Sequence, residues 1–115
     1  MQTEQIAQLR NLAIKVLQDA HKFPSEPNTS TVYSSSKYPD FTISVQNKSL
    51  SDEKTKYYIW FNYNYTSEYG TFNPSIRFRY TKEYGVMLMS TFIKHFNLDK
   101  LLPIYTEIVE SYDYN

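Results

Sequence analysis

The sequence predicts an α+β domain: an N-terminal helix, a three-stranded antiparallel β-sheet, then one or two C-terminal helices. Apolar residues recur at three- and four-residue spacing over residues 3–22, the period of an amphipathic helix. Apolar and polar residues alternate in the segments between 41 and 80, the period of half-buried strands. A helical period returns after residue 81. We expect a single α+β domain over residues 1–115.

The first predicted helix occupies residues 3–22. Thr3 can accept hydrogen bonds from the first backbone amides, and Pro24 cannot continue a helix. The following residues, 24–40, contain three prolines and a run of small polar side chains. That composition is typical of a loop, so residues 24–40 are expected to form an exposed loop.

Three strands are expected next. In residues 41–47, FTISVQN, every second side chain is apolar. The segment 56–65, KYYIWFNYNY, is an aromatic strand with large side chains on both faces. The third strand ends at Tyr80, and Pro74 places an edge or a bulge at its start because proline donates no ladder hydrogen bond.

Two further segments predict the C-terminal helices. VMLMSTFIKHF, residues 86–96, is apolar around most of a helical circumference, and Thr81 can serve as its N-cap. LDKLLPIYTEIVESY, residues 98–112, has one apolar face. Pro103 marks a helix start or a kink in it.

The turn between the second and third strands sets their register. If Ser67–Gly70 form a four-residue loop, Thr66 lies opposite Thr71. The same register places Ile59 opposite Phe78, which joins apolar side chains on one face of the sheet. A shift of one residue would reverse this match, so the pattern supports the register.

The second face of the same strands is the candidate binding surface. The register places Tyr58 opposite Arg79 and Trp60 opposite Arg77, with Asn62 farther along the strand. Tyr, Trp and Arg are enriched at interface hot spots. These five residues therefore predict a docking surface for another protein.

Three alternatives use the same residues. The face can bind single-stranded nucleic acid, because aromatic and arginine side chains stack on bases. It can join two copies of the chain in a structural homodimer. It can also be ordinary core, covered by the first helix or by the 24–40 loop.

The composition favours a cytoplasmic binding protein without a cofactor. Twelve Lys and Arg balance twelve Asp and Glu, and there is no cysteine. No basic excess indicates nucleic acid, and no segment predicts a secretory signal or a membrane span. The two histidines, His21 and His95, have no ligands at zinc-binding spacing. Without nucleotide or catalytic motifs, the sequence predicts neither an enzyme nor a metal site.

The order of elements resembles two groups of small proteins in layout alone. Its first five elements follow the order of double-stranded-RNA-binding domains, but the basic cluster that opens their last helix is replaced here by TKEYGVMLM. The whole order looks like that of certain small phage inhibitors, including some anti-CRISPR proteins. This resemblance implies a phage or bacterial accessory protein of the inhibitor or immunity type.

Overall fold

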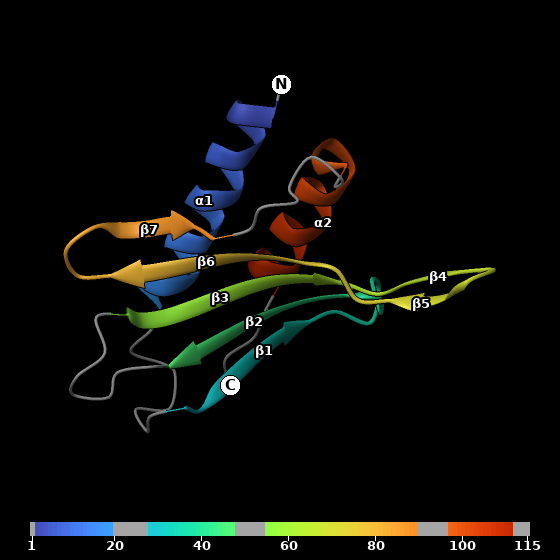
Figure 1. Cartoon of the computed structure of the whole chain (residues 1–115), viewed down its shortest axis with the longest axis horizontal. Helices are drawn as coiled ribbons and strands as arrows, with labels where there is room; N and C mark the ends of the chain where they lie inside the picture. The colour runs from blue at the N-terminus through green and yellow to red at the C-terminus, as the bar shows by residue number, and fades with distance from the viewer. Residues whose placement is uncertain (1, 20–27, 48–54, 90–96, 112–115) are drawn as a thin grey trace.

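A computed structural model describes residues 2–19, 28–47, 55–89 and 97–111. Two helices lie on one side of a five-stranded antiparallel sheet, and a two-stranded ribbon extends from one end of it (Figure 1). The elements are α1 (Gln2–Gln18), β1 (Ser30–Ser34), β2 (Phe41–Asn47), β3 (Thr55–Tyr63), β4 (Tyr65–Ser67), β5 (Gly70–Phe72), β6 (Ser75–Thr81), β7 (Gly85–Leu88) and α2 (Leu98–Ser111).

The predicted class is confirmed, but the predicted sheet is too small. The fold is α+β, with a helix at each end of an antiparallel sheet. The strand order is β1-β2-β3-β6-β7, so there are five strands in place of three. The described residues contain two helices.

The loop expected over residues 24–40 is wrong over residues 30–34, because Ser30–Ser34 form the edge strand β1. This strand pairs antiparallel with β2. The serines at its ends suggest a loop, but the Thr-Val-Tyr sequence between them favours a strand. Tyr33 is fully buried against the core, while Val32 points to the other face and is 50% exposed.

The helix expected from Thr81 through residue 96 is also wrong where the structure describes it. Gly85–Leu88 form β7, which pairs with β6. Gly85 has a φ of +72°, a left-handed conformation that glycine adopts without strain and that ends the tight turn. Thr81 is not an N-cap: its hydroxyl accepts a hydrogen bond from the Tyr84 amide within this turn. Residues 90–96 lie outside the described part.

The other strands follow the prediction with one interruption. β2 has the predicted bounds, whereas the aromatic strand divides into β3 and β4 and its partner into β5 and β6. The break lies at Asn64, whose amide donates to the Asp40 carbonyl, and at Pro74 on the facing strand. This matches the interruption expected at Pro74. Beyond the break, β4 and β5 project past the rest of the sheet (Figure 1).

The core lies between the two helices and one face of the sheet. α1 ends at Gln18, before the predicted residue 22, and contributes a stripe of buried Leu, Ala and Val side chains. α2 follows the prediction over its described length. Its Tyr105 is fully buried, and the hydroxyl donates to the backbone carbonyl of Asn62 at 2.7 Å, which fixes α2 to β3. The buried apolar residues are Leu9, Leu12, Ala13, Val16, Tyr33, Ile43, Val45, Ile59, Phe61, Ile76, Phe78, Val86, Leu98, Leu101, Leu102, Tyr105 and Ile108.

Candidate functional site

The predicted register between β3 and β6 is confirmed. Trp60 pairs with Arg77, Tyr58 with Arg79, and Asn62 with Ser75. The register holds because the turn at Glu68 and Tyr69 keeps Ser67 opposite Gly70. All five predicted site residues therefore share one face of the sheet, as the alternation along the strands requires.

We call this surface the open face. The core-facing residues alternate with it along every strand, and both helices lie on the opposite side of the sheet (Figure 1). No helix or strand in the described ranges packs over it. It consists of Val32, Thr42, Ser44, Gln46, Tyr58, Trp60, Asn62, Arg77, Arg79 and Met87.

Two aromatic rings and one guanidinium form the centre of the open face. The rings of Tyr58 and Trp60 lie 5.5 Å apart at an angle of 39°. The Arg77 guanidinium lies 5.1 Å from the centre of the Tyr58 ring. This cation–π contact is diagonal, because Tyr58 pairs directly with Arg79. Diagonal neighbours on a sheet are within reach of long side chains.

Asn62 has a different role from its neighbours. Its side-chain amide donates to the hydroxyl of Thr42 at 3.2 Å and to that of Ser44 at 3.0 Å, both on β2. These bonds hold β2 and β3 together across the open face. Asn62 therefore links two strands beside the rings of Tyr58 and Trp60, and its amide is engaged within the sheet.

The charge of the open face is positive. Arg77 and Arg79 are its two charged residues, and none of its described members is acidic. The Nε atom of Arg79 is buried and has no hydrogen-bond acceptor. A buried donor without an acceptor costs about 1–3 kcal/mol.

The sequence prediction missed both flanks of the open face. Val32 on β1 is 50% exposed, and Met87 on β7 is 38% exposed. Met87 pairs with Arg79 and so extends the central row by one strand. In the sequence, the Thr-Val-Tyr run is the signal that favours a strand at β1, whereas the continuous apolar run at β7 offers none.

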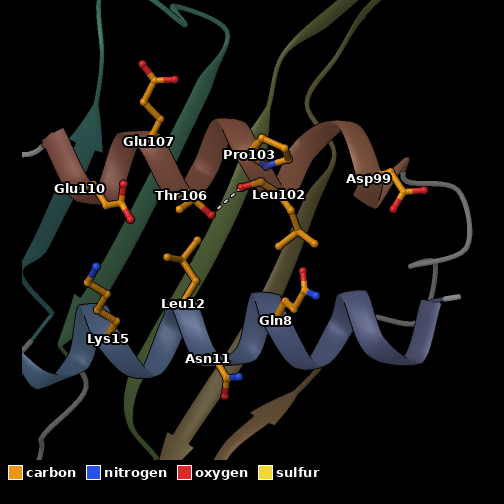
Figure 2. Close-up of a pocket in the computed structure, with 10 residues that line it drawn as sticks. All are labelled: Gln8, Asn11, Leu12, Lys15, Asp99, Leu102, Pro103, Thr106, Glu107 and Glu110. Carbon is orange, nitrogen blue, oxygen red and sulfur yellow. Dashed lines mark hydrogen bonds between the residues drawn. The ribbon is translucent and has the colours of Figure 1, made fainter.

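A groove of about 760 Å³ lies between α1 and α2, on the outer side of the helices (Figure 2). Leu12 and Leu102 point toward each other and fill the space between the helices, whereas Glu107 points away. The acidic side chains of the groove do not converge on one point. Its lining residues are Gln8, Asn11, Leu12, Lys15, Asp99, Leu102, Pro103, Thr106, Glu107 and Glu110.

Glu107 joins α2 to the loop before β2. Its carboxylate accepts from the Tyr38 hydroxyl at 2.7 Å and from the Lys37 ammonium at 2.9 Å. These two hydrogen bonds, that of Tyr38 first, lower the pKa of Glu107. The two hydrogen bonds hold the loop against α2, and the carboxylate of Glu107 accepts both of them.

No group of three potential metal ligands occurs among the described residues. His21 and His95 lie outside the described ranges, so the prediction about them stays a prediction. No described helix is long and apolar enough to cross a membrane.

Comparison of the chain with protein-family models, with curated proteins and with solved structures gave no match.

Proposed function

We propose that this protein is a non-catalytic binding domain whose open face docks on an acidic surface of a partner protein. The observation that carries the proposal is the composition of that face. Tyr58 and Trp60 on β3 lie beside Arg77 and Arg79 on β6, no described member of the face is acidic, and no described helix or strand packs over it. Contiguous surfaces of this kind on small proteins mark interaction sites.

The side chains match those that dominate binding energies. Trp, Tyr and Arg provide most hot spots in protein interfaces, and they cluster near the interface centre. In this sheet, Tyr58 and Trp60 are on the central strand β3, and polar or smaller side chains surround them on β1 and β2. Partner carboxylates would pair with the positive charges of Arg77 and Arg79.

Nucleic acid fits the same geometry less well. The Arg77 guanidinium occupies a position over the Tyr58 ring, where a stacked base would have to lie. Two arginines also provide few phosphate contacts for a strand that crosses the face. Protein docking of this kind would suit an inhibitor or immunity protein of bacteria or phages. The order of helices and strands, which resembles that of small phage inhibitors, supports this form of the proposal.

Affinity capture from a lysate, with matched variants, tests the proposal. The immobilised wild-type protein, Trp60→Ala and Arg79→Ala are compared with Lys15→Ala, which removes a positive charge on the helical side. We expect a nuclease-resistant protein partner that the first two variants lose and the Lys15 variant retains. A partner that all variants retain contradicts docking through the open face. Loss after nuclease treatment favours the nucleic-acid alternative.

A further inference from the structure

A second concave surface lies where the β4–β5 ribbon leaves the sheet, beside the start of α2. This hairpin groove has a volume of about 750 Å³. It is on the helix-bearing side of the sheet, because the α2 residue Leu101 lines it together with Tyr63 and Phe41. Its lining residues are Phe41, Tyr63, Tyr65, Phe72, Asn73, Pro74, Asn97, Lys100 and Leu101.

A ladder of nearly parallel rings forms the wall of the hairpin groove. The rings of Phe41 and Tyr63 lie 4.8 Å apart at 15°, and those of Tyr63 and Tyr65 lie 5.9 Å apart at 21°. Phe72 continues the ladder at 5.6 Å from Tyr65 and 28°. Tyr65 is 44% exposed and Phe72 is 46% exposed. The ladder thus leads from the core into solvent, and its outer rings offer aromatic surface to a flat ligand.

The described polar and charged side chains of the groove favour an anionic ligand. Among the described lining residues, Lys100 is the one that carries a charge, none is a carboxylate, and the amides of Asn73 and Asn97 are further polar groups. A few polar groups in a mainly aromatic hollow of 300–1,000 Å³ are typical of small-molecule sites. A cation at the rim of such a hollow complements an anionic group on the ligand.

We propose that the hairpin groove binds a small planar aromatic molecule that carries an anionic group. The aromatic part lies against Tyr65 and Phe72, and the anion lies near Lys100. The groove and the open face are on opposite sides of the sheet, so this site is independent of the docking proposed above.

Titration with naphthalene-2-carboxylate, followed by amide NMR spectra of the whole chain, tests this site. We expect shifts that centre on Tyr65, Phe72 and Lys100. We also expect the neutral analogue 2-naphthylmethanol to bind about two- to fivefold more weakly, as an exposed charge pair predicts. Lys100→Ala should remove this preference for the anion, and Phe72→Ala should weaken both probes.

Met87→Ala, on the open face, is the matched control for loss of an exposed apolar side chain. It should bind both probes as the wild type does. Phe72 and Lys100 are solvent-exposed, so their replacement should leave the fold intact. Amide spectra that are unchanged away from the groove would show this. Shifts confined to another surface, or equal affinity for the two probes in wild type and the Lys100 variant, overturn the proposal.

Discussion

Replacing Tyr105 by phenylalanine removes one hydroxyl from the centre of the fold and leaves the ring in place. The hydroxyl donates to the Asn62 carbonyl at 2.7 Å, and Tyr105 is fully buried. An intramolecular hydrogen bond of this type contributes about 0.5–1.5 kcal/mol. At pH 8 we therefore expect Tyr105→Phe to be about 1 kcal/mol less stable, with a Tm lower by about 4 °C.

The same substitution should change the response to alkali. Burial, and then the neighbouring Tyr63, raise the pKa of Tyr105 above its ordinary value. A raised pKa contributes stability that is complete below the unfolded value of about 10 and declines as pH rises toward the folded value. In that window the wild type loses about 1.4 kcal/mol per pH unit from this group, and the phenylalanine variant does not. The two stabilities should meet near pH 11.

Urea unfolding from pH 8 to pH 11 measures both effects. The other tyrosines are common to the two proteins, so their titration cancels in the difference. Parallel profiles over the whole range, or equal stability at pH 8, would refute the assignment of Tyr105 as the buried bond between α2 and β3.

Three further predictions concern the edge, the core and the loop. Gly85→Ala should cost about 1–2 kcal/mol in urea unfolding, because its φ of +72° strains any residue with a Cβ atom, and an unchanged midpoint would contradict the β6–β7 turn. Ile76→Ala should cost about 2–5 kcal/mol, whereas the exposed Met87→Ala should stay within about 0.5 kcal/mol; equal costs would reverse the two faces of the sheet. Glu107→Gln should lower the Tm at pH 7 by more than in acid, since a lowered pKa contributes stability above about 4.5 that is lost as pH falls through the folded value. A pH-independent difference would contradict the bond from Tyr38.

Local patterns were sufficient for the elements that have long periodic segments. The seven residues of β2 and the fourteen of α2 each cover several repeats of their period, so the sequence predicts both. β7 has four residues, and four consecutive apolar side chains fit a helix and a strand equally well. β1 is bordered by serines that favour a loop, and its pairing with β2 is what stabilises it as an edge strand.

The open face was predictable because it follows from one tight turn. The residues at Ser67 and Gly70 fix the register, and alternation then assigns Tyr58 and Trp60 to one face. The hairpin groove was not predictable in the same way. Tyr63 continues the core-facing row of β3, and Tyr65 follows two residues later. Only the position of α2 determines which of these inward aromatic rings stay uncovered.

Acrylamide quenching of Trp60 in a dilution series, with light scattering for mass, tests the central claim most directly. Trp60 is the only tryptophan in the chain, so its fluorescence reports on the open face alone. The account predicts a monomer in which acrylamide quenches Trp60 readily and its emission is red-shifted. Blue-shifted emission that is protected in the monomer would show that the face is covered core. Protection that appears only at concentrations where the mass doubles would identify a second copy of the chain as the occupant.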